Sequence, residues 1–391
     1  LRRGLRFMAE GFQKGRPPAL APNGTGINIL DFGMLWVQSL AEYIQITKDH
    51  TFLADMYPTL EAFLNYLIGF ENSDTGLLDL PMTHWSKGVY LDPIANMNRY
   101  GQSTAINSFY VSTLLKAASL ARAYNRLGDE YLWEQKATTI QTEINNLLYL
   151  PQEGRYITTI FDGIKYEPTP HAQAWPLAFG LVPSDETESV ADSLLELLSD
   201  DPTSPNVEIY GMAWVLEALG EAGYIPEALD IIQTYYGYMI DAGATTWWEQ
   251  FNSDKYYWSS LSHGWGSSPT WFLSTYLLGG RWVSPDTWEV RPALTGVFTA
   301  SGAVPLPSGL LDIAWTRESC TKSFLDVTSP TGTSGIVILQ LPKVESLVLN
   351  DLLIFDNGIP LADYVSIFPD RIEIVVSEAG NYHLDIREIC E

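Results

Sequence analysis

The chain has 391 residues, of which 46 % are hydrophobic and 18 % are charged, a balance typical of a globular protein rather than a disordered one. Its formal net charge is −25, with 22 Lys and Arg against 47 Asp and Glu. A phosphate-binding surface needs clustered basic residues, so we expect neither nucleic acid nor an anionic membrane surface as a partner. No run of about 18 apolar residues indicates a transmembrane helix.

Helical periodicity dominates residues 31 to about 280. The stretch after Asp31 is the clearest, because its apolar side chains recur at three- and four-residue intervals. Nine segments are predicted as helices, most of them in pairs: residues 1–12, 32–46, 57–70, 103–128, 130–150, 186–199, 210–223, 226–240 and 268–280.

Short and long connections alternate between these helices. The connections at 48–50 and 127–129 are short, whereas those at 77–100, 151–175 and 245–269 are long and rich in aromatic residues. Helical hairpins whose long loops fall on one side indicate an α/α toroid with a site at its loop end. An ordinary α-solenoid is the alternative, but no strict repeat of 34 or 40 residues supports it.

The pattern changes at residues 281–285, where turns rich in Gly and Pro begin to separate short alternating stretches. Six of these stretches are predicted as strands: residues 309–317, 323–329, 335–342, 346–351, 371–377 and 381–388. We therefore expect two domains, a helical toroid over 1–282 and a β-sandwich over 283–391. Cys320 and Cys390 form either a disulfide or two separate thiols, and neither arrangement fixes the compartment.

One short region crowds tryptophans around a single carboxylate, Glu249. Its members are Trp247, Trp248, Trp258, Trp265 and Trp271. An aromatic ring stacked on the C–H face of a sugar buries apolar area while the hydroxyls keep their hydrogen bonds, so this region indicates a carbohydrate site. A carboxylate held among indoles suits proton transfer, and we interpret Glu249 as a general base. The alternatives are aromatic core packing and a structural, salt-bridged glutamate.

Other chemistry is less strongly indicated. His263, in the run Ser-Leu-Ser-His-Gly-Trp, is placed to bind a sugar hydroxyl, although a single histidine is also common as a structural residue. Candidate second carboxylates in the long loops are Asp31, Asp92 and Asp254. No His, Cys or Asp cluster has zinc-ligand spacing, and no serine elbow or phosphate-binding loop occurs, so we expect no metal or cofactor.

The segment 243–251, Gly-Ala-Thr-Thr-Trp-Trp-Glu-Gln-Phe, followed by residues 260–280, resembles the corresponding part of α-L-rhamnosidases of glycoside hydrolase family 78. Residues 29–60, 85–93, 101–121 and 171–183 are also similar to that family, and 283–391 resembles its C-terminal β-domain. The resemblance implies an (α/α)6 barrel, inverting hydrolysis of terminal α-L-rhamnosyl residues, Glu249 as general base and a rhamnose-containing glycoside as substrate. It implies a pocket formed by His263, Trp247, Trp248, Trp265, Trp85, Asp31, Asp92 and Asn107.

The sequence also departs from the family pattern. The family's acidic loop with its general acid does not occur here, so the resemblance implies that the acid precedes residue 1 and that the toroid is incomplete at its N-terminus. Two alternatives stay open. The first is another six-hairpin enzyme, such as a glucuronyl hydrolase or a glucoamylase-like enzyme, and the second is a non-catalytic carbohydrate-binding protein.

Overall fold

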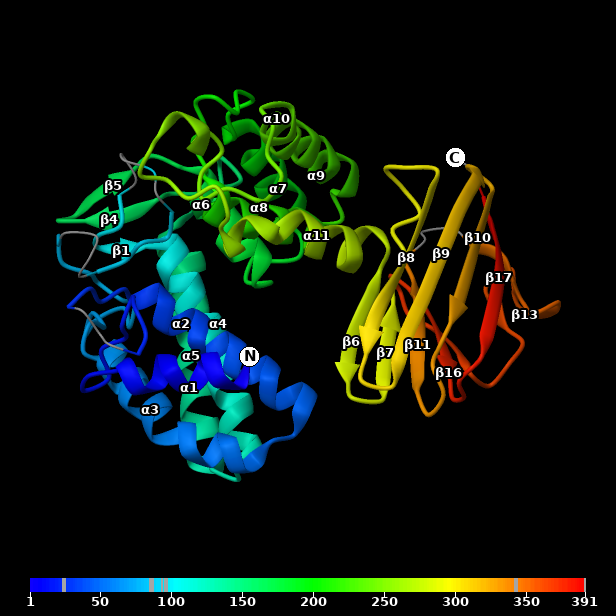
Figure 1. Ribbon diagram of the computed structural model, residues 1–391, viewed down its shortest axis with the longest axis horizontal. Coiled ribbons are helices and arrows are strands. Elements are labelled where there is room, and N and C mark those ends of the chain that lie inside the picture. Colours follow the sequence, from blue (N-terminus) through cyan, green and yellow to red (C-terminus); the bar gives the residue numbers. More distant parts are fainter. Residues whose placement is uncertain (23–25, 84–87, 93, 95–97, 341–343, 390–391) are drawn as a thin grey trace. The chain divides into compact units, whose positions relative to one another are not determined.

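The computed structural model describes residues 1–22, 26–83, 88–92, 94, 98–340 and 344–389. The chain forms two compact units (Figure 1). The helical unit comprises Leu1–Tyr224 and Gln233–Gly266, and the β-rich unit comprises Ile225–Ile232 and Ser267–Glu391. Each unit has its own core.

Paired helices make up most of the helical unit, as the periodicity predicts. These helices are α1 (Arg2–Gly11), α2 (Leu30–Thr47), α3 (His50–Ile68), α4 (Thr104–Ala123), α5 (Leu127–Leu147), α6 (Pro170–Ala178), α7 (Thr187–Leu197) and α8 (Ile209–Ala222). The turn between α2 and α3 shows why the pairs form. Lys48 ends α2 in a left-handed conformation, and Asp49 caps α3 by accepting a hydrogen bond from the Phe52 amide at 3.0 Å.

The helices form two layers, because α2, α4, α6 and α8 pack against one another in that order while α5 and α7 cover them. Helices α4 and α6 are buried on nearly every side, whereas α5 and α7 bury a single face. The long connections 69–103, 148–169 and 198–208 lead into the N-termini of α4, α6 and α8. The expected α/α architecture is confirmed, and the N-termini of its inner helices lie at the end with the long loops.

Two segments of the chain before residue 242 differ from the sequence prediction. Residues 151–175, expected as one long loop, form β3 (Arg155–Tyr156), β4 (Thr159–Phe161), β5 (Ile164–Tyr166) and the start of α6. That expectation was wrong because α6 is short and buried all round, so its sequence carries no apolar stripe. The helix predicted over 226–240 consists of α9 (Ile225–Ile231), a π-helical turn η2 (Ile232–Tyr236) and α10 (Gly237–Asp241).

Two sheets form the β-rich unit, and the expected β-sandwich is confirmed. A seven-stranded antiparallel sheet has the order β14-β13-β12-β17-β10-β9-β8, and a five-stranded sheet has the order β15-β16-β11-β7-β6. The strands are β6 (Gly280–Ser284), β7 (Thr287–Val290), β8 (Thr299–Leu306), β9 (Gly309–Ser319), β10 (Lys322–Thr328), β11 (Ser334–Leu339), β12 (Val344–Leu349), β13 (Leu352–Asp356), β14 (Ile359–Pro360), β15 (Val365–Ile367), β16 (Ile372–Val376) and β17 (Asn381–Glu388). Alternate side chains such as Leu311, Ile313 and Trp315 of β9 fill the core.

The junction between the helices and the strands is gradual. Helix α11 (Ser268–Phe272) and the π-helical turn η5 (Leu273–Leu277) belong to the β-rich unit, where the Trp315 indole donates to the Leu277 carbonyl at 3.0 Å. Strand β6 already begins at Gly280. The domain boundary that we expected between residues 282 and 283 remains a proposal. Cys320 is disulfide-bonded, and Cys390 lies outside the described residues.

Candidate active site

The loop between α10 and α11 folds back on itself at Glu249. The Glu249 amide donates to the Ser260 carbonyl at 2.9 Å, and the Ser260 amide donates to Glu249 Oε2 at 2.8 Å. The His263 amide donates to the Trp247 carbonyl at 2.8 Å, which continues the pairing. These bonds bring His263 Nδ1 to 3.9 Å from Glu249 Oε2, with 32 % and 27 % of the two side chains exposed. The structure therefore brings together Glu249 and His263, two residues that the sequence singled out.

An aromatic stack stands beside this pair. The Trp265 ring stacks on His263 at a centroid distance of 4.1 Å and on Tyr90 at 5.8 Å, and Tyr210 packs edge-on to it at 5.4 Å. The Trp265 indole also donates to the Glu249 carbonyl at 3.1 Å. Sequence reasoning missed Tyr90 and Tyr210, although Tyr90 lies in the long loop beside Asp92. Aromatic side chains from three distant segments thus meet at Trp265, which is hydrogen-bonded to the Glu249 backbone.

The two tryptophans before Glu249 are placed differently. Trp248 is buried, with 4 % of its surface exposed, and Trp247 packs edge-on against Tyr236 at 5.5 Å. This placement favours Trp248 as a core residue that fixes the loop rather than as an exposed sugar platform. Trp85 lies outside the described residues.

Asp31 is completely buried in the first turn of α2. Its oxygens accept hydrogen bonds from the amides of Tyr90 (2.8 Å) and Leu91 (3.0 Å) and from the Tyr210 hydroxyl (3.2 Å). Burial raises the pKa of Asp31, while the amides of Tyr90 and Leu91 oppose that shift. The expected pocket residue therefore holds the 88–92 segment and Tyr210 in place.

Asp92 is also fully buried, and it organises the N-terminus of α8. Its carboxylate accepts hydrogen bonds from the amides of Glu208 (2.7 Å) and Gly211 (3.1 Å), and His171 Nε2 lies at 2.9 Å. A negative charge at a helix N-terminus is favourable because the amides there have no partner within the helix. Asp31 and Asp92 thus tie the N-termini of α2, α6 and α8 to the same loop segment.

Asn107 is also a buried candidate residue. Its side-chain amide binds both backbone groups of Leu78: it accepts a hydrogen bond from the Leu78 amide at 2.7 Å and donates one to the Leu78 carbonyl at 3.1 Å. It also donates to the Ser103 carbonyl at 2.9 Å. The side chains of Asp31, Asp92 and Asn107 therefore each make three internal hydrogen bonds. This placement favours positioning roles rather than sugar contact.

Glu208 is a buried carboxylate that sequence reasoning missed. Its Oε2 accepts a hydrogen bond from the Phe251 amide at 3.0 Å, two residues after Glu249. Burial raises the pKa of Glu208 to about 7, and the negative charge of Asp92 adds to the shift. Glu208 occupies the N-cap position of α8, but its side chain makes no capping hydrogen bond and Glu is not a preferred N-cap residue, so the sequence carried no signal for its role. Glu208 joins the Asp92 cluster to the Glu249 loop.

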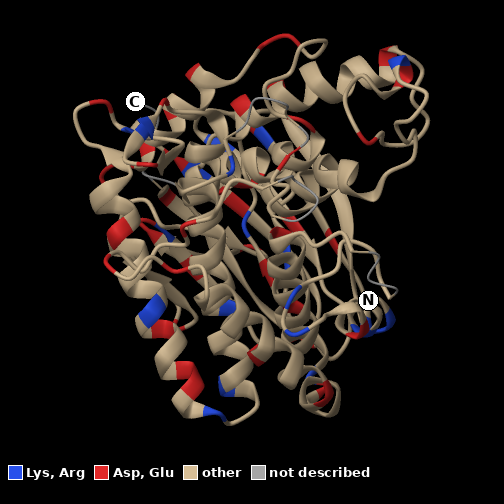
Figure 2. Cartoon of the chain, turned by 90° about the vertical axis from the view of Figure 1, so that its left-hand side faces the viewer, with Lys and Arg blue, Asp and Glu red and all other residues tan. Residues whose placement is uncertain are grey.

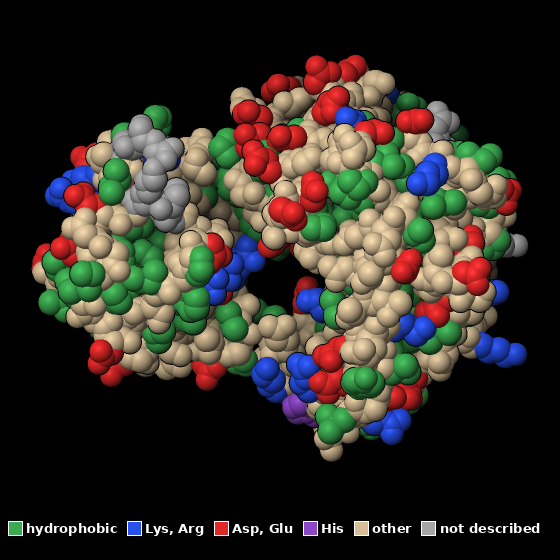
Figure 3. All heavy atoms as spheres, turned by 180° about the vertical axis from the view of Figure 1, so that it is seen from behind, with side chains coloured by type: hydrophobic (Ala, Val, Ile, Leu, Met, Phe, Trp, Pro, Cys, Tyr) green, Lys and Arg blue, Asp and Glu red, His purple; other side chains and the backbone are tan. Residues whose placement is uncertain are grey.

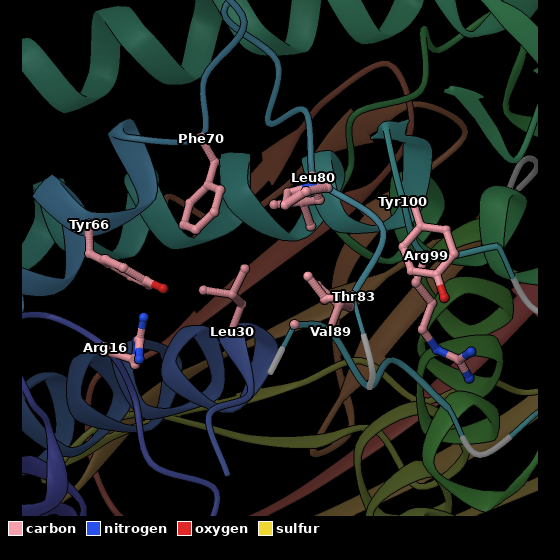
Figure 4. Close-up of a pocket in the computed structure, with 11 residues that line it drawn as sticks. Arg16, Leu30, Tyr66, Phe70, Leu80, Thr83, Val89, Arg99 and Tyr100 are labelled. Atoms are coloured by element: carbon pink, nitrogen blue, oxygen red, sulfur yellow. The ribbon is translucent and has the colours of Figure 1, made fainter. Parts of the chain in front are cut away.

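A separate cavity of about 300 Å³ is lined in part by Gly88 and Val89. Figure 4 shows Tyr66, Phe70, Leu30 and Leu80 around it, with Arg16 beside Tyr66. Arg99 also lines it, but its guanidinium donates to the carbonyls of Tyr90 and Ile94. None of the described residues that line this cavity carries a carboxylate.

Charged residues are dispersed over the described elements (Figure 2). On the face drawn in Figure 3, Lys and Arg occur in small groups interspersed with Asp and Glu. Across the described ranges, no helix is long and apolar enough to cross a membrane. In that same part of the chain, no group of three or more His, Cys, Asp or Glu is arranged to hold a metal ion.

Solved structures share this fold. A Streptomyces avermitilis α-L-rhamnosidase complexed with L-rhamnose superposes with a TM-score of 0.73 at 19 % identity, covering 98 % of this chain and 36 % of that one. A family 78 rhamnosidase from a Bacillus species gives a TM-score of 0.74 at 24 % identity, covering 86 % and 36 %. The chain therefore shares the fold of about a third of each of these structures, with helices followed by β-sheets.

Sequence comparison identifies the family. Residues 2–277 match the model of the bacterial α-L-rhamnosidase six-hairpin glycosidase domain, and the chain belongs to that family. An Alteromonas α-L-rhamnosidase is 26 % identical over 304 residues, which cover 71 % of this chain and 31 % of that protein. A Formosa agariphila α-L-rhamnosidase is 26 % identical over 201 residues, covering 46 % and 21 %. The chain thus spans about a third or less of the length of these relatives.

Proposed function

We propose that the protein hydrolyses the bond to a terminal α-L-rhamnosyl residue of a glycoside, with Glu249 as the general base of an inverting reaction. The observation that supports it best is the Glu249–Ser260 pairing beside His263 and Trp265. One carboxylate oxygen is oriented by the Ser260 amide, while about a quarter of the side chain stays exposed. An oriented, partly exposed carboxylate can accept a proton from a water that attacks the anomeric carbon.

The neighbouring groups suit a bound sugar. His263 carries ring nitrogens that can hydrogen-bond a hydroxyl, and Trp265 with Tyr90 provides an apolar surface for a C–H face. Family membership supports rhamnose as that sugar, and the Streptomyces relative is described in complex with L-rhamnose. We include Trp247 among the residues that shape this pocket.

The inverting reaction needs a second carboxyl group, about 6.5–9.5 Å from the first, which donates a proton to the leaving-group oxygen. We do not assign Asp31, Asp92 or Glu208 to this role, because all three are buried and bound by backbone amides. Our proposal therefore concerns the base half of the reaction.

Replacing Glu249 by Gln tests this proposal. The amide keeps nearly the same shape but cannot accept the proton, so kcat of the full protein on an aryl α-L-rhamnoside should fall by about 100-fold to 10,000-fold. Binding of L-rhamnose, measured by calorimetry, should persist. The matched control is Glu42→Gln, an exposed glutamate on α2, which should leave kcat unchanged. A Glu249→Gln enzyme with normal turnover would exclude Glu249 as the base.

A further inference from the structure

Glu208 is a buried carboxyl group that the proposed reaction does not use. Only 5 % of it is exposed, and its Oε2 accepts a hydrogen bond from the Phe251 amide at 3.0 Å. The two residues are 43 positions apart, so this bond joins the N-terminus of α8 to the loop that carries Glu249. Phe251 is itself fully buried, and its amide would be a costly unsatisfied donor if it lost this acceptor.

The contacts of Glu249 itself lie within its own loop, residues 242–267. Ser260 exchanges two hydrogen bonds with Glu249, and the Trp265 indole donates to the Glu249 carbonyl. The His263 Nδ1 atom lies 3.9 Å from the Glu249 carboxylate. These contacts fix Glu249 relative to the loop, but by themselves they do not fix the loop relative to the helices.

Two buried residues anchor the loop on either side of Glu249. Trp248 precedes it directly and is 4 % exposed, and Phe251 follows it two positions later. The Phe251 ring packs on Tyr235 at a centroid distance of 4.8 Å. Glu249 therefore lies in a short span between two fixed points, and the main chain of the second point is held by Glu208.

The main chain of Glu208 is fixed in turn by Asp92. The Asp92 carboxylate accepts hydrogen bonds from the amides of Glu208 at 2.7 Å and Gly211 at 3.1 Å, while His171 Nε2 of α6 lies at 2.9 Å. A reactive group is held accurately when the residues that support it are themselves locked by hydrogen bonds. Glu208 is therefore a stiff support for the loop.

We propose that Glu208 is a positioning residue for the general base: its bond to the Phe251 amide keeps Glu249 at the distance from the sugar that leaves room for one water. This inference rests on the proposed function. Sugar contact through His263 should depend on Glu208 less, because the His263 amide is bonded to Trp247, before the first anchor. Loss of Glu208 should therefore slow turnover more than it weakens sugar binding.

The test replaces Glu208 in the full protein. Glu208→Ala should lower kcat on an aryl α-L-rhamnoside about tenfold to 100-fold, while KM and inhibition by L-rhamnose change by less than about threefold. Glu208→Gln should bring kcat back to within about threefold of the wild type, because its amide oxygen can accept the same hydrogen bond. If the alanine variant does not fold, Glu208→Asp takes its place, since Asp is a preferred N-cap residue with a shorter side chain.

The matched control is Gln173→Ala on α6. Gln173 is fully buried, and its Oε1 accepts a hydrogen bond from the Tyr156 amide at 2.8 Å, so this variant also deprives a buried amide of its acceptor. Tyr156 lies in β3, outside the loop of Glu249. Gln173→Ala should therefore lower Tm but leave kcat unchanged. A fall in kcat equal to that of Glu208→Ala would indicate general loosening and overturn the inference.

A double variant shows whether Glu208 acts through Glu249. In a Glu249→Gln background no base is left to position, so adding Glu208→Ala should lower the residual kcat by less than about twofold. Independent effects would multiply instead, and the same tenfold or larger loss would appear in both backgrounds.

Three further results would overturn the inference: wild-type kcat in Glu208→Ala, equal losses in both backgrounds, or no recovery of kcat in Glu208→Gln. In each case an active wild-type protein and an inactive Glu249→Gln variant keep the proposed function intact. A wild-type protein that does not cleave the rhamnoside, or a fully active Glu249→Gln variant, would overturn the proposed function and this inference together.

Discussion

Replacing Glu208 by Gln should change how the stability of the protein depends on pH. The pKa of Glu208 is raised from 4.5 to about 7, mainly by burial and further by Asp92. Between these two pH values the folded protein retains a proton that the unfolded chain has released, so rising pH favours unfolding. At about 1.4 kcal/mol per pH unit, this single group lowers the free energy of unfolding by about 3 kcal/mol from pH 4.5 to 7.

The amide of Gln stays neutral at every pH, and its oxygen can still accept the hydrogen bond from the Phe251 amide. The variant and the wild type should therefore be about equally stable near pH 4.5, whereas the variant should be the more stable by about 3 kcal/mol at pH 8. Urea unfolding followed by tryptophan fluorescence at pH 5, 6, 7 and 8 measures the difference, with Glu42→Gln as an exposed control. A difference that does not vary with pH would refute this reasoning.

Two further substitutions test the site. His263→Ala should raise KM for a rhamnoside and weaken inhibition by rhamnose while lowering Tm only slightly, because a third of the side chain is already exposed; an unchanged KM together with unchanged inhibition contradicts a sugar contact. Gly266→Ala should lower the free energy of unfolding by about 1–3 kcal/mol. The added Cβ at position 266 would lie 2.7 Å from Trp247 Cβ and 3.0 Å from the Trp248 carbonyl oxygen, so the segment before Glu249 would have to shift and kcat should fall. Gly264→Ala is its control, since a Cβ there meets no atom within 4 Å; identical Tm values for both variants would argue against this packing.

Local patterns in the sequence determined the architecture. The three- and four-residue spacing of apolar side chains predicted α2, α3, α4 and α5, and two-residue alternation predicted strands such as β9 and β17. These signals are reliable because each element buries one face against its neighbours. Glu249 and His263 were singled out as separate candidates and by the resemblance to family 78, and one folded-back loop brings them to within 3.9 Å of each other.

The tertiary structure alone decided which polar and aromatic residues face the interior. Asp92 meets Glu208 and Gly211 across 116 and 119 positions, and Asp31 meets Tyr210 across 179. No local spacing carries such pairings, because they arise where the N-termini of separate helices converge on one loop. Where these N-termini meet, Asp31 and Asp92, which the sequence indicated as pocket residues, are buried. Tyr90 of the same loop stacks on Trp265. Periodicity reports which face of an element is covered, whereas the identity of what covers it depends on contacts that only the folded chain makes.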